Sequence, residues 1–176
     1  MTNYKQKLKN ISTFILDVDG VLTDGSVLLL PDGTMSRTMN TRDGYAMQLA
    51  IKQGFNIIII TGGKDELIKK RLEGLGVADI FLGVTHKMDA YNEVLYRYNL
   101  KPENIIYMGD DIPDYEVMIN VGLPTCPYNA TPEIREISEY ISPKNGGEGC
   151  VRDIIEQTLK IHNKWILFDN ELPTSA

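Results

Sequence analysis

Cysteine and histidine are scarce in this sequence of 176 residues, which contains two of each. Cys126 and Cys150 are too few and too far apart to form a disulfide framework or a thiolate metal cluster. Only His86 and His162 could help to ligate zinc. If the protein binds a metal ion, we therefore expect a hard cation held by carboxylate oxygens.

Basic residues are outnumbered by acidic residues, 18 to 24, and long apolar runs are absent. Nucleic acid attracts proteins through clustered Lys and Arg, so nucleic acid is not an expected partner. The longest aliphatic runs, Val27–Leu30 and Ile57–Ile60, are far too short to span a membrane. The first ten residues are polar and lysine-bearing, without the apolar stretch of a signal peptide. We therefore expect a cytoplasmic protein with no membrane partner.

The length and the apolar content of 43% suit one domain that covers residues 1–176. Short aliphatic runs alternate along the chain with segments of helical periodicity. We expect strands over Thr13–Leu16, Phe55–Ile60, Asp79–Leu82, Asn104–Met108 and Leu123–Cys126. Helices are expected over Lys64–Leu75 and Lys87–Tyr98, with a last helix that carries Val151 to Leu159. This alternation predicts a doubly wound α/β fold with a mainly parallel sheet.

One segment after the first strand interrupts this alternation. Ser26–Leu30 and Met35–Met39 flank a Pro-Asp-Gly turn, which predicts an inserted β-hairpin at about residues 26–39. Val27–Leu30 is apolar on both faces, and an isolated two-stranded hairpin is marginal in water, so these side chains need a partner surface. The alternative is that the hairpin folds back on its own domain.

Two acidic residues follow the first predicted strand. Asp17 and Asp19 come directly after Thr13–Leu16, at the strand end where open α/β sheets place their ligand crevice. Residues two apart near a strand end point to the same side, so the two carboxylates can converge, and Gly20 permits a tight turn beside them. Such a pair is more often solvated in a turn, so the functional hypothesis depends on the rest of the chain.

A hydroxyl and a lysine occupy equivalent places further along the chain. Thr61 follows Ile57–Ile60, and Gly62-Gly63 leaves backbone N–H groups free at the predicted start of a helix, which suits an anion. A threonine cap followed by a glycine turn is the alternative. Lys87 opens the next predicted helix, where its charge opposes the helix dipole, so a ligand role is favoured.

A second acidic cluster, Asp110, Asp111 and Asp114, follows the strand Asn104–Met108. One of these residues could merely cap a helix that has Pro113 near its first turn. Three carboxylates in five residues exceed what a cap requires. Mg²⁺ prefers carboxylate and carbonyl oxygens together with substrate phosphate, and all of these side chains can face one crevice. The sequence therefore predicts a magnesium site that performs phosphoryl transfer.

The acid pair lies in the stretch Asp17–Gly25, and the later motifs are Thr61-Gly62-Gly63, Lys87 and Gly109-Asp110-Asp111. In this order they resemble the four motifs of the haloacid dehalogenase phosphatases. Arg42-Asp43-Gly44 and Gly146–Gly149 are similar to the subgroup that hydrolyses 3-deoxy-D-manno-octulosonate 8-phosphate. The resemblance implies a phosphatase that acts in lipopolysaccharide precursor synthesis.

The resemblance also implies roles in catalysis. Asp17 would be the nucleophile that forms an aspartyl phosphate, and Asp19 would be the general acid and base. Thr61 and backbone N–H groups, with Gly20 and Gly62 among the residues beside the phosphate, would hold its oxygens.

The same resemblance implies a set of residues around the metal. Mg²⁺ would be bound by Asp17, the Asp19 carbonyl and Asp110, while Lys87 would offset the negative charge shared by the nucleophile and the phosphate. Asp111 or Asp114 would support these ligands without binding the metal directly. Spacing alone does not divide the roles of the last two acids.

The sequence leaves several candidates for the residue that binds the sugar-acid carboxylate. Members of the subgroup often carry Arg after Thr-Gly, whereas this chain has Gly63 and Lys64 there. Lys64, Arg71 or Arg42 could bind the substrate carboxylate instead, although such side chains on a helix surface are more often simply solvated. The expected substrate is the eight-carbon sugar-acid phosphate, and a nine-carbon sialic-acid-type 9-phosphate is the alternative.

Two other classes of protein compete with this hypothesis. A signalling receiver domain combines similar residues in a similar fold, but its lysine comes last, whereas here the second acidic cluster follows Lys87. A binding module that lost catalysis is the third hypothesis, although every chemical role has a residue to fill it.

Assembly is a further expectation. The segments between Asp17 and Thr61 and between Thr61 and Lys87 are too short for a cap domain. Similar enzymes form tetramers in which hairpins associate and neighbouring chains complete the site. The resemblance therefore implies a homotetramer with Val27–Leu30 at the interface. The Gly146–Gly149 loop or the C-terminal tail, about residues 163–176, would then lie near an active site.

Overall fold

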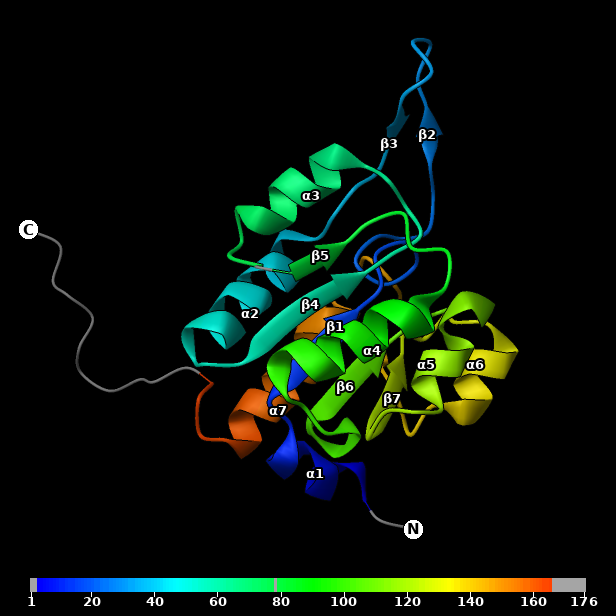
Figure 1. Ribbon diagram of the computed structural model, residues 1–176. Helices are drawn as coiled ribbons and strands as arrows, with labels where there is room; N and C mark the ends of the chain where they lie inside the picture. The colour runs from blue at the N-terminus through cyan, green and yellow to red at the C-terminus, as the bar shows by residue number, and fades with distance from the viewer. Residues whose placement is uncertain (1–2, 78, 166–176) are drawn as a thin grey trace, which may run out of the picture.

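A computed structural model describes residues 3–77 and 79–165, and its centre is a six-stranded sheet (Figure 1). The strand order is β5-β4-β1-β6-β7-β8, and every neighbouring pair in it is parallel. The strands are β1 (Thr13–Leu16), β4 (Asn56–Ile60), β5 (Asp79–Phe81), β6 (Ile105–Met108), β7 (Leu123–Cys126) and β8 (Tyr140–Ile141). The predicted α/β fold with a mainly parallel sheet is confirmed.

Helices cover both faces of this sheet. One face packs against α1 (Tyr4–Lys7), α2 (Thr41–Lys52), α3 (Glu66–Glu73) and α7 (Cys150–Ile161). The other packs against α4 (Lys87–Tyr98), α5 (Tyr115–Met118) and α6 (Pro132–Ile137). Short 3-10 helices are η1 (Leu8–Asn10), η2 (Pro102–Asn104) and η3 (Ile112–Asp114). Phe14 and Leu16 lie in the first core and Ile15 in the second, so both sides of β1 are buried, which explains its unbroken apolar sequence.

The observed helices and strands differ from the predicted ones mainly at their ends. Helix α4 has the predicted bounds, but the helix expected over Lys64–Leu75 begins only at Glu66. Asp65 caps it there, because its Oδ1 accepts hydrogen bonds from the N–H groups of Leu67 and Ile68. Strand β8 was not predicted, since two half-buried residues carry no periodic signal. No helix in the described part of the chain is long and apolar enough to cross a membrane.

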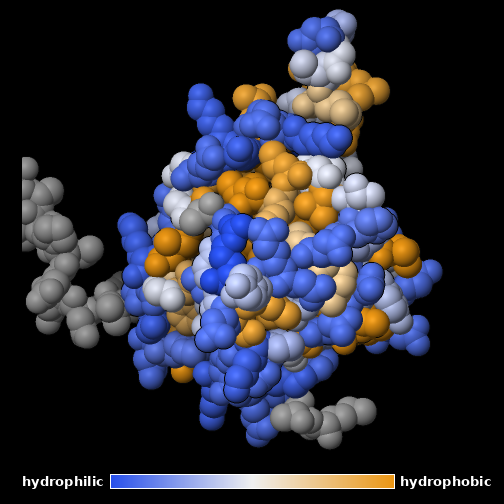
Figure 2. Space-filling view, in the orientation of Figure 1, coloured by the Kyte–Doolittle hydropathy of each residue, from blue (hydrophilic) through white to orange (hydrophobic). Residues whose placement is uncertain are grey.

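The predicted hairpin is present, with β2 (Leu28–Leu29) paired antiparallel to β3 (Met35–Ser36). It projects away from the sheet and its helices (Figure 1), and Figure 2 shows hydrophobic side chains on its surface. Leu28 is 64% exposed and Leu29 is 74% exposed. The alternative in which these leucines pack on their own domain is therefore wrong. Residues 166–176, most of the expected tail, lie outside the described residues.

Candidate active site

A cleft of about 470 Å³ lies at the carboxyl ends of the central strands. Most of the predicted site residues line it: Asp17, Asp19, Gly20, Thr61, Gly62, Lys87, Asp110, Asp111 and Asp114. They come together because β1 lies between β4 and β6, and the loops that follow these three strands open at the same edge of the sheet. Thr85, which lies just before α4, also lines the cleft and was not predicted.

Lys87 is buried between two carboxylates. Its Nζ lies 2.8 Å from Oδ2 of Asp17 and 2.7 Å from Oδ1 of Asp114. Burial by itself lowers the pKa of Lys87, but the carboxylates of Asp114 and Asp17 together raise it above its ordinary value. The lysine is therefore charged at neutral pH, and its two partners account for a cation at the start of α4.

Asp114 has both carboxylate oxygens engaged. Oδ1 accepts hydrogen bonds from Lys87 and, at 2.6 Å, from the hydroxyl of Tyr107. Oδ2 accepts hydrogen bonds from the backbone N–H groups of Asp110 and Asp111. The sequence did not reveal the role of Tyr107, because an aromatic residue in the apolar strand β6 is typical of a core. Asp114 thus fixes both Lys87 and the loop after β6.

Asp17 and Asp110 are carboxyl groups with a raised affinity for protons. Burial, aided by the charge of Asp114, raises the pKa of Asp17 to about 6. Burial and the charges of Asp114 and Asp17 raise the pKa of Asp110 to about 7. Both values lie well above the usual range for aspartate, because burial and then the neighbouring carboxylates disfavour the ionised forms.

This cluster also suits a metal ion. One oxygen each of Asp17, Asp110 and Asp114 lies within 4.8 Å of the others. Oδ1 of Asp17 is buried and has no hydrogen-bond partner among the described residues. Three carboxylates opposed by Lys87 leave an excess of negative charge, and a buried unpaired anionic oxygen is costly. A hard divalent cation would remove both costs.

Gly20 allows the loops after β1 and β6 to meet. Its φ is +83°, and a Cβ at this position would lie 2.0 Å from Oδ2 of Asp110. A larger residue would therefore displace the Asp110 carboxylate from the cluster. Gly146 packs against the same loop, since a Cβ added there would lie 1.8 Å from the Gly20 carbonyl oxygen. The Gly146–Gly149 loop thus braces the loop that carries Asp19.

Residues at the start of helix α2 contact this glycine loop and the helix that follows it. Asp43 is buried, and its Oδ1 accepts a hydrogen bond from the N–H of Arg152 at 2.6 Å, in the first turn of α7. Asn40 donates a side-chain hydrogen bond to the Gly147 carbonyl. The Arg42-Asp43-Gly44 motif therefore helps to fix the start of α7, which follows the glycine loop.

The environment of Thr61 differs from the prediction in two respects. Its Oγ1 accepts a hydrogen bond from the N–H of Gly63 at 3.1 Å, so this N–H group is not free. The glycines precede α3 by several residues and do not begin it, because Asp65 is the cap. Thr61 and Gly62 nevertheless line the cleft.

Two predicted residues lie outside the cleft and one lies at its margin. Arg42 is exposed in the first turn of α2, and Lys64 lies over Gly83 and lines an adjoining groove. Asp111 lines the cleft but is exposed, and its Oδ1 accepts a hydrogen bond from the Ile112 N–H at the start of η3. The structure therefore brings neither Arg42 nor Lys64 together with Asp17.

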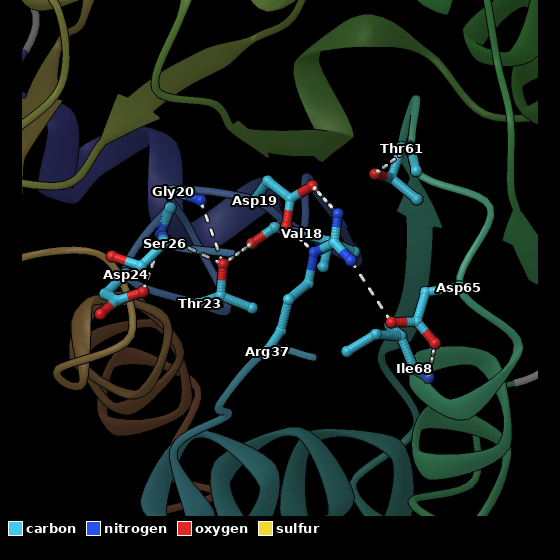
Figure 3. A network of polar contacts seen from close by, with 12 residues as sticks. Val18, Asp19, Gly20, Thr23, Asp24, Ser26, Arg37, Thr61, Asp65 and Ile68 are labelled. Atoms are coloured by element: carbon cyan, nitrogen blue, oxygen red, sulfur yellow. Dashed lines mark hydrogen bonds and ion pairs between the residues drawn. The ribbon is translucent and has the colours of Figure 1, made fainter. Parts of the chain in front are cut away.

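Arg37 is the candidate that sequence reasoning missed. Figure 3 shows its guanidinium directed at Asp19, with Nε 2.6 Å from Oδ1 and Nη2 3.1 Å from Oδ2. A single arginine near a hairpin strand is typical of a solvated surface charge, and 18 residues separate it from its partner. No spacing rule relates the two positions.

Known proteins resemble this chain over most of its length. The haloacid dehalogenase-like hydrolase family matches residues 75–154. A 3-deoxy-D-manno-octulosonate 8-phosphate phosphatase of Salmonella typhi is 35% identical over 163 residues, which are 93% of this chain and 87% of that protein. The crystal structure of such a phosphatase from Yersinia pestis matches with a TM-score of 0.90 and 33% identity, covering 93% of this chain and 88% of that one.

A second crystal structure carries ligands. It is the 3-deoxy-D-manno-octulosonate 8-phosphate phosphatase of Moraxella catarrhalis in complex with a magnesium ion, a phosphate ion and a 3-deoxy-D-manno-octulosonate (KDO) molecule. It matches with a TM-score of 0.89 and 32% identity, and the match covers 93% of this chain and 94% of that one.

Proposed function

Because this chain belongs to the haloacid dehalogenase-like hydrolases, in the group of the 3-deoxy-D-manno-octulosonate 8-phosphate phosphatases, we propose that it hydrolyses this sugar-acid phosphate. It is a phosphomonoester hydrolase, and its proposed products are KDO and phosphate for lipopolysaccharide precursor synthesis. The observation that carries the proposal is the buried carboxylate of Asp17 in the cleft, held by Lys87 and next to Asp110.

In the proposed reaction, the carboxylate of Asp17 attacks phosphorus and the bond to the sugar oxygen breaks, which leaves an aspartyl phosphate. Asp19 gives its proton to the departing sugar oxygen. It then takes a proton from the water that attacks the aspartyl phosphate, so both carboxylates return to their starting states. Lys87 keeps its charge throughout and offsets the negative charge on Asp17 and the phosphate.

The metal of this reaction is proposed to be Mg²⁺. Asp17 and Asp110, with the Asp19 carbonyl, would hold it, and the occupied oxygens of Asp114 support a positioning role for that residue. When bound, the ion supplies electrostatic stabilisation of the phosphate oxygens in the transition state. Two carboxylates with raised pKa values fit such an ion, as does a carboxylate oxygen with no hydrogen-bond partner in residues 3–77 and 79–165.

Magnesium is expected to stabilise the protein more at pH 8 than at pH 5.5. An aspartate whose folded pKa is raised contributes stability below its ordinary pKa and loses it as the pH rises through the folded value, here about 6 for Asp17 and about 7 for Asp110. The metal-free protein therefore loses stability as the pH rises through these folded pKa values, and bound Mg²⁺ restores the lost stability. A cation at 100 times its Kd adds about 2.7 kcal/mol, or roughly 5–10 °C in Tm for a chain of this length.

Thermal unfolding with and without Mg²⁺ at both pH values measures this effect. Asp110→Asn should remove most of the shift, and Asp89→Asn, which changes an exposed residue of α4, should leave it intact. An equal shift at both pH values would contradict the assignment of Asp17 and Asp110 to the metal.

Phosphate release from a panel of sugar-acid phosphates tests the substrate. We expect the highest kcat/KM for KDO 8-phosphate, a lower value for a nine-carbon sialic-acid-type 9-phosphate, and a much lower value for a hexose 6-phosphate that lacks a carboxylate. A site that pairs the carboxylate of a sugar acid would leave its pairing group without a partner when the neutral sugar binds. A preference for the nine-carbon substrate would replace the proposed substrate while leaving the reaction unchanged.

The active form is proposed to be a homotetramer. Leu28 and Leu29 expose apolar side chains on a hairpin that stands away from the sheet, and such a surface is typical of an interface between protein chains. Burial of this surface between copies of the chain would also supply a wall for the cleft, over which the described residues form no cap domain.

Light scattering at micromolar concentration is expected to give a tetrameric mass. Leu28→Asp with Leu29→Asp should dissociate the assembly and lower turnover of sugar phosphate, because the contact would bury unpaired charges. Tyr96→Asp is the matched control, since Tyr96 is 91% exposed on α4 and not part of the hairpin. A monomeric wild type with full activity would rule the tetramer out.

A further inference from the structure

Arg37 links the hairpin to the proposed proton donor of the reaction. It is the first residue after β3, and its side chain is only 9% exposed. Nε and Nη2 donate to the two carboxylate oxygens of Asp19, in the paired arrangement that a guanidinium makes with a carboxylate (Figure 3). A lysine could not make both hydrogen bonds in this geometry.

The guanidinium is itself held at a second point. Nη1 lies 3.3 Å from Oδ2 of Asp65, whose Oδ1 caps helix α3 by accepting the Leu67 and Ile68 N–H groups. Arg37 therefore connects the loop after β1 to the segment after β4. An arginine anchored in this way keeps a fixed position, since any rotation of the guanidinium breaks a charged hydrogen bond.

The Asp19 carboxylate is held by its hydrogen bonds with Arg37. Its side chain is 37% exposed, and in the described part of the chain Arg37 alone donates hydrogen bonds to its carboxylate. Asp19 lines the cleft together with Asp17. A short, half-exposed carboxylate without a partner would rotate among several orientations, and only some of them place an oxygen beside a departing group.

We propose that Arg37 is a positioning residue that orients the Asp19 carboxylate for proton transfer to the departing sugar oxygen. This inference rests on the proposed function, because it requires Asp19 to be the general acid. Arg37 exchanges no proton itself, since a guanidinium stays charged. Each oxygen of Asp19 has a second lone pair, so the pairing with Arg37 leaves a place for the proton that Asp19 gives up and regains.

A purely structural role for Arg37 makes a different prediction. If the residue only fastened the hairpin, its loss would slow every substrate alike. If Arg37 orients Asp19, its replacement slows mainly those substrates whose leaving group must be protonated. The ratio kcat/KM is the suitable measure, because it reports the steps up to formation of the aspartyl phosphate and not its hydrolysis.

The experiment compares KDO 8-phosphate with 4-nitrophenyl phosphate, whose phenolate departs without a proton. For Arg37→Met we expect kcat/KM to fall about 10- to 100-fold with the sugar phosphate, the size of effect that a misplaced catalytic group produces. With the aryl phosphate we expect a fall of less than about threefold. Arg37→Lys keeps the charge without the paired hydrogen bonds and should lie between the wild type and Arg37→Met with the sugar phosphate.

Two further variants serve as references. Asp19→Asn should show the same selective loss, and the double variant with Arg37→Met should be no worse than Asp19→Asn alone, because both remove one function. Arg97→Met is the matched control, since Arg97 also pairs with two acids, Asp79 and Glu93, but does not line the cleft. Its kcat/KM should match the wild type for both substrates.

The outcomes separate this inference from the function on which it rests. Equal losses with both substrates, or additive losses in the double variant, would overturn the positioning role. Wild-type activity of Asp19→Asn on the sugar phosphate would instead overturn the proposed role of Asp19. A selective loss in Asp19→Asn without one in Arg37→Met would exclude the positioning role of Arg37 and leave the proposed role of Asp19 intact. If Arg37→Met does not fold, the same substrate pair applied to Arg37→Lys decides the question.

Discussion

Asp17→Asn is expected to abolish phosphate release while the protein stays folded. The amide has nearly the shape of the carboxylate, but it is not an anionic nucleophile and cannot form an acyl phosphate. We expect turnover to fall by more than about 1,000-fold, since removal of a nucleophile leaves only binding and electrostatic contributions. The fold should persist because Lys87 keeps its second partner, Asp114, at 2.7 Å.

Phosphate release from KDO 8-phosphate measures the loss of turnover, and circular dichroism with thermal unfolding measures the fold. The free energy of unfolding at pH 8 should not fall, because the pKa of about 6 shows that burial disfavours the ionised form of Asp17. Asp89→Asn is the control, since it makes the same change at an exposed position of α4. Magnesium-dependent turnover that survives in Asp17→Asn would show that another group attacks phosphorus.

Much of the fold could be predicted because each central strand is buried on both faces. Ile57–Ile60 shows this, since an unbroken aliphatic run of that length fits a buried parallel strand and little else. The hairpin followed from turn chemistry between two apolar segments. Strand β8 could not be found, because its two residues are half-buried and pair only at the edge of the sheet.

The candidate site was predictable where its residues follow strands directly. Asp17, Thr61 and Asp110 come at or just after the ends of β1, β4 and β6, so adjacency in the sheet brings them together. Arg37 and Tyr107 were missed for opposite physical reasons. The arginine is carried by a hairpin whose position in space no local pattern determines, and the tyrosine has its ring in the core while only its hydroxyl reaches Asp114.

The prediction of a free helix start at Gly62-Gly63 failed for a local reason. Asp65 is a better cap than the glycines, because its side chain accepts two N–H groups of α3. Its other oxygen binds Arg37, so one residue fixes both the helix and the guanidinium. The pattern of glycines alone could not distinguish these arrangements.

Lys87→Met is expected to reduce both turnover and stability, and the stability loss should depend on pH. Methionine has a similar length but no charge, so Asp17 and Asp114 would remain buried without their cation. Removing one partner of a buried ion pair costs about 3–5 kcal/mol. Turnover should fall about 100-fold or more, the effect of losing one preorganised electrostatic contact to the reacting group.

The pH dependence of the stability loss follows from the carboxylates whose negative charge Lys87 offsets in the wild type. The charge of Lys87 lowers the pKa values of Asp17 and Asp110, which are nevertheless raised to about 6 and about 7. Without the lysine both values rise further, and an acid with a raised folded pKa loses its stabilising contribution as the pH rises through that value. Lys87→Met should therefore be close to the wild type near pH 5 and much less stable near pH 8, as measured by urea unfolding.

Magnesium separates the two roles of Lys87 in this variant. At pH 8 the ion should restore part of the lost stability, because it neutralises the same carboxylates, but it should not restore turnover, because it cannot replace the ammonium group beside Asp17. Lys70→Met, a change at an exposed lysine of α3, should leave stability and turnover unchanged. Equal destabilisation at both pH values would mean that Lys87 contributes through packing and not through its charge.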